Sequence, residues 1–379
     1  MSIKPFQINI DQKQLDDLKL RLSQTRWVEK ETPDDWSQGI PLAYMKDIHA
    51  TWLNDYDWRP IEEKLNGLGS FMTEIDGVDI HFLHIRSPHA GARPLIMTHG
   101  WPGSVLEFMK VIPMLTEPEK HGGKAEDAFH LVLPTMPGYG FSGKPTSTGW
   151  TIDRIGAAWA ELMARLGYAR YLAQGGDWGS AVTIAIGRAD PEHCAGVHVN
   201  MVIAMPDEEI MTAPTPEEQR LLADFMLHQE WGTGYAKQQS TRPQTLAYAL
   251  VDSPIGQAAW ILEKFHEWAD CDGHPENIFT RNELLDNVMM YWLSAAGGSS
   301  ARLYWESYNS INADEFTLPM GGTVFPVEIF KPSRRWASKQ YTNIVFWSEP
   351  ERGGHFAAFE QPETLVKDLR ECFKIIWNS

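Results

Sequence analysis

The chain has 379 residues, 43% of them hydrophobic and 22% charged, which suits one large α/β domain with an insertion or two ordinary domains. Its formal net charge of −17 disfavours nucleic acids and anionic membranes as partners and favours a small neutral substrate. The three cysteines lie far apart without a CxxC pair, so they predict reduced thiols and argue against a disulfide framework or a zinc site.

The N-terminal region, residues 1–70, is predicted to be helical. Asp11 can cap a helix on which Leu15, Leu18 and Leu22 form one apolar stripe. Charged residues recur every few positions at the start of the chain, without an apolar block. We therefore expect no signal peptide, no membrane anchor and a cytoplasmic location.

Two alternating runs follow, and the Asp76-Gly77 step between them predicts a β-hairpin of residues 71–75 and 78–85. From residue 94, short apolar runs alternate with helical stretches, which predicts a mostly parallel sheet with helices on both faces. The expected strands are residues 94–98, 129–133, 171–174 and 197–202, with helices from residue 104 and over 152–166. Residues 71–203 thus form the first part of the predicted α/β core.

The next stretch, residues 204–312, is rich in Trp, Tyr and Met and carries helical patterns without strand signals. Strand patterns return at residues 323–327 and 344–347, and a closing helix is expected from residue 360. Residues 313–379 are therefore the predicted second part of the core. An insertion placed in this way predicts a helical lid over the carboxyl edge of the sheet, where open α/β sheets hold their active sites.

A glycine-rich turn, Gly175-Gly176-Asp177-Trp178-Gly179, joins a predicted strand to a predicted helix. It fits the G-x-Nu-x-G pattern, in which a sharp turn projects a nucleophile above the sheet of an α/β-hydrolase. Taken alone, the same five residues could be a plain turn with Asp177 as a helix N-cap. Together with the strand order, the motif predicts an α/β-hydrolase fold with a helical lid and an N-terminal helical extension.

Aspartate at the position that serine usually occupies changes the chemistry that is available. A carboxylate that attacks an ester or amide would give an anhydride, which is a poor intermediate. A carboxylate that attacks a saturated carbon gives an alkyl ester, and water can hydrolyse that ester at its acyl carbon. Asp177 therefore predicts a substrate with an electrophilic sp³ carbon and a leaving group, such as an epoxide or a haloalkane.

The HGWPGS sequence at residues 99–104 follows the first buried strand of the predicted core. In hydrolases of this fold, one oxyanion-hole N–H comes from this loop and the other from the residue after the nucleophile. The matching donors are the backbone N–H groups of Trp101 and Trp178. His99 is expected to orient the loop, and not to act as a base.

His355 is the histidine, among the 13 in the chain, that lies between the last apolar strand and the final helix. The chain order nucleophile, acid, histidine predicts that it is the catalytic base. Its acidic partner should follow a strand between Asp177 and His355. Glu328, directly after the predicted strand 323–327, meets this requirement, and Glu349 and Glu351 are the alternatives.

Four segments resemble the corresponding segments of the microsomal-type epoxide hydrolases: HGWPGS, GGDWGS, FPVEI and RGGHFAAFEQP. The early sequence PFQINIDQKQLDDLKLRLSQTRW is also similar to the N-terminal region of that family, so the likeness covers nearly the whole chain. The resemblance implies Asp177 as nucleophile, His355 as base and Glu328 as its partner. The membrane-anchoring N-terminal helix of the microsomal enzymes has no counterpart here, which implies a soluble relative.

Two lid tyrosines are identified by this resemblance alone. Tyr235, in GYAKQQSTRPQT, and Tyr304, in SSARLYWE, match residues that donate hydrogen bonds to the epoxide oxygen in the family. The resemblance further implies conversion of an epoxide to a vicinal diol, with no metal ion and no organic cofactor.

Two other functions remain open from the sequence. A haloalkane or haloacid dehalogenase uses the same Asp–His chemistry, and the indole N–H of Trp178 could hold a leaving halide. A non-catalytic relative that only binds a ligand is disfavoured by the intact nucleophile, acid and base. The sequence also leaves open whether the chain forms a homodimer.

Overall fold

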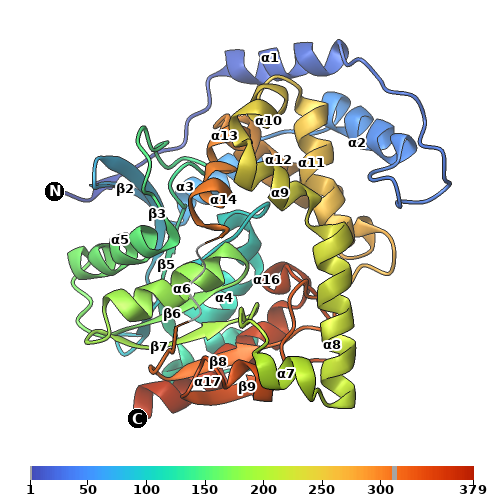
Figure 1. Ribbon diagram of the computed structural model, residues 1–379. Coiled ribbons are helices and arrows are strands. Elements are labelled where there is room, and N and C mark those ends of the chain that lie inside the picture. The colour runs from blue at the N-terminus through green and yellow to red at the C-terminus, as the bar shows by residue number, and fades with distance from the viewer. Residues whose placement is uncertain (1, 310–313) are drawn as a thin grey trace.

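The computed structural model describes residues 2–309 and 314–379. In these residues one sheet of nine strands has the order β1-β2-β3-β5-β4-β6-β7-β8-β9 (Figure 1). All neighbours from β5 to β9 run parallel, and the β1–β2, β2–β3 and β3–β5 pairs run antiparallel, so the prediction of an α/β fold with a mostly parallel sheet is confirmed. The strands are β1 Lys4–Pro5, β2 Ser70–Ile75, β3 Val78–Ile85, β4 Arg93–Thr98, β5 Phe129–Pro134, β6 Tyr171–Gly175, β7 Cys194–Val199, β8 Met320–Thr323 and β9 Ile344–Ser348.

The predicted hairpin is formed by β2 and β3, which pair from Ile75 opposite Val78. The two residues between them both have positive φ, 53° at Asp76 and 79° at Gly77. Two such residues make the turn whose twist matches that of the flanking strands, which explains why Asp-Gly is favoured here.

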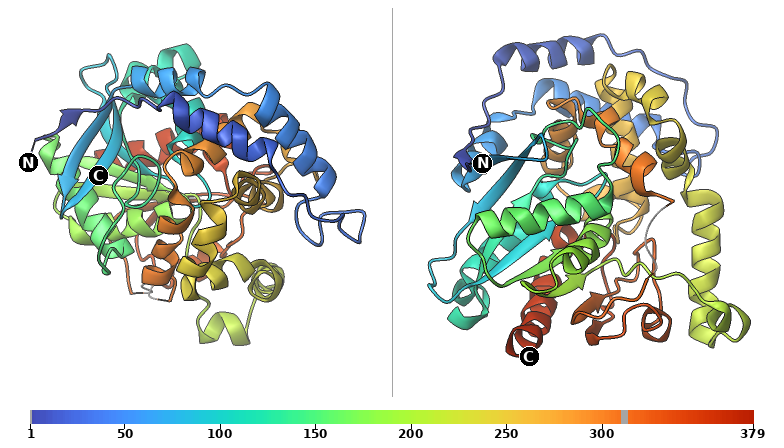
Figure 2. Two further views of the ribbon diagram at one scale, coloured as in Figure 1. Left: turned by 90° about the horizontal axis from the view of Figure 1, so that it is seen from above. Right: turned by 60° about the vertical axis from the view of Figure 1, so that its left-hand side comes forward.

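Helices cover the sheet on both faces (Figure 2). α5 and α6 pack against each other, and α6 contacts β4, β6 and β7, whereas α17 contacts β7, β8, β9 and α4. The core helices are α4 Val111–Thr116, α5 Ile152–Arg165, α6 Trp178–Ala189, α15 Arg334–Ala337, α16 Ala357–Glu360 and α17 Pro362–Asn378. The ten residues 178–187 of α6 are all buried, which explains its run of small and apolar residues.

The N-terminal extension consists mainly of α1 Gln12–Ser23, α2 Leu42–Asn54 and α3 Arg59–Gly67. As predicted, the Asp11 side chain caps α1 by accepting a hydrogen bond from Lys13 N, and Leu18 and Leu22 are buried. The sequence does not predict the two-residue strand β1. α1 packs against α2 and the lid helix α11 (Pro254–Glu267), so the extension supports the lid from outside.

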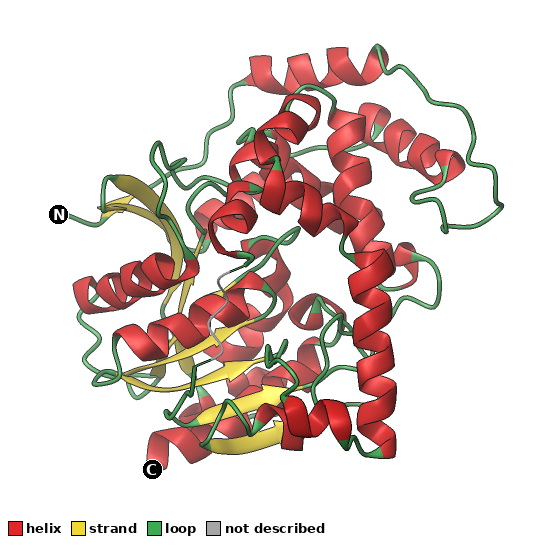
Figure 3. Cartoon of the chain, in the orientation of Figure 1, coloured by secondary structure: helices red, strands yellow, loops and turns green. Residues whose placement is uncertain are grey.

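Between β7 and β8 the described residues form helices and loops only (Figure 3). These helices, called the lid below, are α7 Glu208–Thr212, α8 Pro216–Leu227, α9 Gly234–Thr241, α10 Pro243–Leu250, α11, α12 Arg281–Trp292, α13 Ala296–Ser299 and α14 Arg302–Ser307. The division of the chain at residues 70, 203 and 312 stays a prediction, and residue 312 lies outside the described residues.

The predicted strand at residues 323–327 is wrong in its position, because β8 ends at Thr323. The strand itself is Met-Gly-Gly-Thr and has little intrinsic strand preference. It contains glycines because neighbours lie very close: a Cβ at Gly321 would lie 2.3 Å from Cys372 Sγ. Tertiary packing therefore sets this strand, and no local pattern could indicate it. The helix expected from residue 104 begins instead as a 3₁₀ helix, Val105–Lys110, before α4.

Across residues 2–309 and 314–379, no helix combines the length and the apolar character that crossing a bilayer requires. All three cysteines are buried and unpaired.

The hairpin turn gives a test of the sheet's edge. Gly77→Ala should lower the free energy of unfolding by about 1 kcal/mol, because the alanine must adopt positive φ. Its Cβ would meet no atom within 4 Å, so backbone strain is the only cost. Urea unfolding measures the effect.

Gly91→Ala is the matched control, since that turn glycine also has open space around its Cβ position but lacks a positive φ. It should leave stability unchanged or raise it by less than about 1 kcal/mol. Equal losses in both variants would contradict the assigned turn.

Candidate active site

Asp177 occupies the sharp turn between β6 and α6, at φ 52° and ψ −129°, and its residue surface is only 7% exposed. Glycines make this turn possible. A Cβ at Gly179 would lie 1.9 Å from the carbonyl oxygen of Thr98, and one at Gly175 would lie 2.1 Å from the oxygen of Gly179. The first turn of α6 is thus pressed against the end of β4, and Asp177 stands above the carboxyl edge of the sheet.

The loop after β4 meets the Asp177 carboxylate from the side. The Trp101 backbone N–H donates a hydrogen bond to Asp177 Oδ1 at 2.7 Å. His99 is buried in the same loop, where Nδ1 lies 2.9 Å from Gly100 O and Nε2 accepts from Met136 N at 3.3 Å. Burial lowers the pKa of His99 to about 4, so the ring is neutral at pH 7, as expected for a residue that orients the loop.

The lid holds the other side of this loop. The Asn287 side-chain amide donates to Pro102 O at 2.8 Å, and the Tyr291 hydroxyl donates to Gly103 O at 2.7 Å. Both donors lie on α12. The backbone that presents the Trp101 N–H is therefore fixed by lid and core together.

His355 lies on the other side of Asp177. Its Nε2 is 3.5 Å from Asp177 Oδ2, and its Nδ1 is 2.6 Å from Glu328 Oε1. Both His355 and Glu328 are buried. The Ile329 N–H also donates to Glu328 Oε1 at 2.7 Å, which fixes the carboxylate. The structure therefore brings the three predicted triad residues into one contiguous row.

Glu328 is the only one of the three candidate acids that contacts His355 in the described structure. Glu349 is exposed and accepts a hydrogen bond from Trp347 Nε1 at 2.5 Å, and Glu351 is also exposed. Glu328 does not directly follow a strand, contrary to the prediction, because β8 ends at Thr323. The connecting segment instead pairs with the loop of His355 through Val327 N and Gly353 O at 3.1 Å.

Burial alone would lower the pKa of His355, but the negative charges of Glu328 and Asp177 raise it well above its usual value. The resting imidazole is therefore a cation held between two carboxylates. Loss of either negative charge should lower this pKa, so that more of the ring is in the neutral form that can accept a proton.

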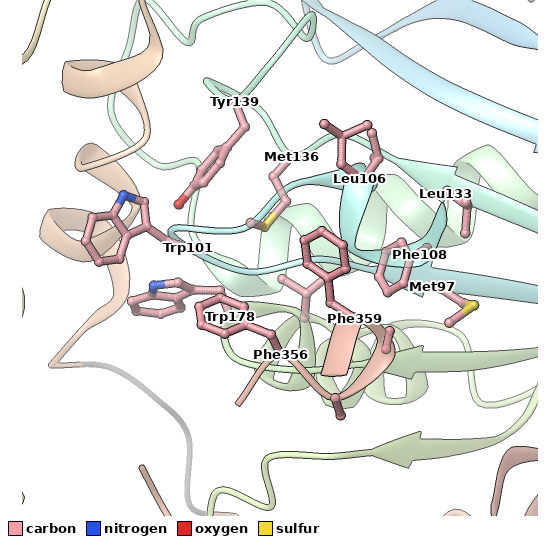
Figure 4. Packing of buried hydrophobic residues seen from close by; sticks show 14 of the residues in the cluster. Met97, Trp101, Leu106, Phe108, Leu133, Met136, Tyr139, Trp178, Phe356 and Phe359 are labelled. Atoms are coloured by element: carbon pink, nitrogen blue, oxygen red, sulfur yellow. The ribbon is translucent and has the colours of Figure 1, made fainter. Parts of the chain in front are cut away.

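Tyr235 on α9 and Tyr304 on α14 come together over the same pocket, with ring centroids 5.8 Å apart at 79°. Tyr235 stacks on Trp101 at 5.1 Å and 8°, and Tyr304 meets the edge of Trp178 at 4.8 Å and 83°. Figure 4 shows both indole rings at one edge of the buried apolar cluster. Each lid tyrosine thus rests on an aromatic ring of the core.

Both phenols are protonated in the resting site. Burial and the charge of Asp177 raise the pKa of Tyr235 well above its usual value. Burial, Tyr235 and Asp177 do the same for the pKa of Tyr304. The Tyr304 hydroxyl is buried next to the side chains of Tyr235 and Trp178, which both interact with it.

These groups open into a pocket of about 1210 Å³, counted out to its open mouth. Its walls are mostly apolar and aromatic, with a smaller set of uncharged polar side chains. The lining residues are Asp177, Trp178, Met201, Ile203, Met205, Phe225, His228, Gln229, Tyr235, Tyr304, Tyr308, Asn309, Ile329, Phe330 and Gln340. In the described part of the chain, no group of three or more His, Cys, Asp and Glu side chains could hold a metal ion.

The chain matches the family model for the epoxide hydrolase N terminus over residues 3–108 and that for the alpha/beta hydrolase fold over residues 93–250. Epoxide hydrolase 1 of Sus scrofa is 36% identical to it, over 99% of this chain and 89% of the pig protein. The chain belongs to the epoxide hydrolase family. The resemblance to the microsomal-type enzymes is thereby confirmed.

A Stigmatella aurantiaca protein that carries the epoxide hydrolase name is 52% identical, over 98% of this chain and 85% of its own length. The crystal structure of juvenile hormone epoxide hydrolase from the silkworm Bombyx mori superposes with a TM-score of 0.91 at 30% identity, covering 100% of this chain and 95% of that one. The α/β-hydrolase fold predicted from the nucleophile turn is thus shared with solved epoxide hydrolases.

Sequence reasoning misses two carboxylates beside the three residues of the predicted triad. Burial raises the pKa of Glu107 to about 8 and that of Glu360 to about 7, and both interact with the charge of His355. It also misses His228, which a single turn of π-helix (His228–Gly232) presents to the pocket. Charged residues near loops are usually solvated, so the sequence gives little reason to place these residues in the site. The one indication is the spacing HFAAFE, in which Glu360 lies one helical turn after Phe356.

The charge arrangement around His355 predicts a measurable shift. Asp177→Asn removes one of the two negative charges, so the pKa of His355 should fall while Glu328 still holds Nδ1. NMR titration of ¹⁵N-labelled histidine, with His355→Ala used for assignment, measures this pKa.

His193 is an internal control. Its pKa is raised by Asp190, whose Oδ1 lies 2.6 Å from Nδ1 at the surface, and it should not change. An unchanged His355 pKa in Asp177→Asn would show that the two groups are not electrostatically coupled.

Proposed function

We propose that this epoxide hydrolase converts an epoxide and water into a vicinal diol through a covalent alkyl ester on Asp177. The observation that carries the proposal is the double contact of the Asp177 carboxylate. One oxygen accepts the Trp101 N–H and the other faces the imidazole of His355, while two protonated phenols lie over the same pocket.

In the first step, Asp177 Oδ2 attacks an epoxide carbon and the carbon–oxygen bond of the ring breaks. Tyr235 and Tyr304 donate hydrogen bonds to the leaving oxygen, and one of them gives it a proton. Positioned acid catalysis of this kind is worth about 10²–10⁴-fold in rate. The stacked contacts with Trp101 and Trp178 hold the two phenols in place for this task.

Ester formation then changes His355. Because the ester of Asp177 is uncharged, one cause of the raised pKa of His355 disappears, and the imidazolium can release its proton. That proton replaces the one that the tyrosine gave to the epoxide oxygen, so the phenol is restored. The site thus prepares a neutral base only after the first step is complete.

In the second step, neutral His355 takes a proton from water as the water oxygen attacks the ester carbonyl carbon. The N–H groups of Trp101 and Trp178 stabilise the oxyanion that forms. The bond between this carbon and the alkyl oxygen then breaks, and the alkyl oxygen takes the remaining proton of the attacking water as the diol leaves. Asp177 then returns to a carboxylate, and Glu328 stabilises the imidazolium.

The substrate is proposed to be small and neutral, because the pocket is mainly apolar and the chain carries a net charge of −17. The proposed cycle uses no metal ion and no organic cofactor. A cytoplasmic location is supported by the three buried, unpaired thiols. We further propose that the enzyme serves in detoxification, and a homodimer remains possible.

His355→Ala tests the two-step scheme, since it keeps the nucleophile and removes the base. With styrene oxide as the probe, the intact protein mass should rise by one substrate, and hydrolysis should stall. In wild-type enzyme, a single turnover in ¹⁸O-water should place label in the Asp177 carboxylate. Label found directly in the diol would mean that water attacks the epoxide itself.

A double change of the lid tyrosines tests the proton donors. Tyr235→Phe combined with Tyr304→Phe, in the His355→Ala background, should slow ester formation from styrene oxide by about 10²-fold or more. Any reaction with an alkyl bromide should be much less affected, because a halide leaves without a proton. Near-parental ester formation from the epoxide would assign these tyrosines to packing alone.

A further inference from the structure

The loop that carries His355 is fastened to the lid as well as to the core. Gly353 N donates to Asp270 Oδ2 at 2.9 Å, and His355 N donates to Trp268 O at 3.0 Å. Trp268 and Asp270 belong to the lid segment that directly follows α11. The lid therefore supplies hydrogen-bond acceptors to the backbone of the proposed base and of a residue just before it.

Among the described residues of this lid segment, Asp270 makes the most hydrogen bonds to the loop that carries His355 and to its neighbours. Its carboxylate also accepts hydrogen bonds from Arg352, at 2.5 Å from Nε and 3.2 Å from Nη2. Its own N–H donates to Glu360 Oε2 at 2.8 Å, and Glu360 Oε1 accepts the Phe356 N–H at 2.8 Å. The Asp270 side chain is 13% exposed and Arg352 is 57% exposed, so the bond to Gly353 N is better shielded from water than the bonds to Arg352.

The backbones of the lid and the loop touch at Gly354. A Cβ at this position would lie 2.5 Å from Trp268 O and 3.0 Å from Asp270 N. The Trp268 ring also meets the His355 ring at 4.9 Å and the Tyr235 ring at 5.0 Å. One lid segment thus contacts both the proposed base and one proposed acid.

We propose that Asp270 is a positioning residue for the second half of the reaction, which holds the loop so that His355 Nε2 faces the ester. The inference rests on the proposed role of His355. Ring opening depends less on this loop than ester hydrolysis does, because the Trp101 N–H holds the attacking carboxylate from the other side. Ester hydrolysis does depend on it, since displacement of a catalytic group by about 1 Å can cost about 10²-fold in rate.

Asp270→Ala separates the two steps. After rapid mixing with styrene oxide and acid quenching, intact-protein mass gives the rates of ester formation and ester decay. We expect formation near the wild-type rate and decay slower by about 10- to 10²-fold, so that the ester accumulates in the steady state. A purely structural role would slow both steps alike, and that result, or wild-type decay, would overturn the proposal.

Asp272→Asn is the matched control. Asp272 also binds Arg352 Nη2, at 3.2 Å, but its side chain is 74% exposed and accepts no backbone N–H of the His355 loop in the described structure. It should leave both rates unchanged.

Asp270→Asn keeps an oxygen acceptor for Gly353 N and loses the charge that binds Arg352. Its ester decay should lie between those of wild type and Asp270→Ala. If Asp270→Ala does not fold, selective slowing of decay in Asp270→Asn decides the question in the same way. Absence of ester in His355→Ala would instead overturn the proposed function itself, so the two failures are distinguishable.

Discussion

The close approach of α6 to the end of β4 is the constraint on which the site depends. Gly179 and Gly175 have no side chain because backbone oxygens occupy the space where a Cβ would stand. This contact forces Asp177 to positive φ and raises its side chain above the sheet. A residue in that region of backbone space is strained, and such strain persists only where the surroundings impose it. Here the buried helix α6 and the parallel strands on either side impose it.

The same contact places the loop after β4 beside Asp177, the proposed nucleophile, so that the Trp101 N–H reaches Asp177 Oδ1. In the buried site, the positive charge of His355 is compensated by the neighbouring carboxylates. Glu328 and Asp177 keep His355 as a cation, and they raise its pKa although burial alone would lower it. A protonated His355 cannot accept a proton from water. In the proposed cycle, alkylation of Asp177 removes the charge that helps to keep His355 protonated, and this would set the order of the two steps.

Local patterns are enough to predict the hairpin, the strands β4, β5 and β6 and the turn at Asp177, because each depends on residues close together in the sequence. The strand predicted at residues 197–202 exists but lies earlier, at Cys194–Val199. Local patterns fail at β8, whose two glycines are there to admit Cys372 and other neighbours that lie far away along the chain. The sequence selects Glu328 because it is expected directly after a strand, but in the structure the strand ends earlier, at Thr323. Its contact with His355 arises because the loops of both residues pair at Val327 and Gly353.

The lid residues are beyond any local pattern. Tyr235 and Tyr304 are identified only by family resemblance, because helical spacing does not distinguish a tyrosine that faces a pocket from one that packs. Asp270 gives no signal that would separate it from an ordinary solvated acid, and Glu360 gives only its spacing of one helical turn from Phe356. Their roles emerge only once folding has placed them against backbone N–H groups of the loop that carries His355.

The lid of this enzyme is therefore better described as half of the active site than as a cover. Besides its two tyrosines, it binds the oxyanion loop through Asn287 and Tyr291, and the His355 loop through Trp268 and Asp270. A rigid opening of the lid would break these hydrogen bonds and disturb the proposed oxyanion donor and base together. Several of them involve buried groups, and leaving such a group unpaired costs about 1–3 kcal/mol each. Substrate exchange by small movements at the open mouth of the pocket would avoid that cost and would leave both loops in place.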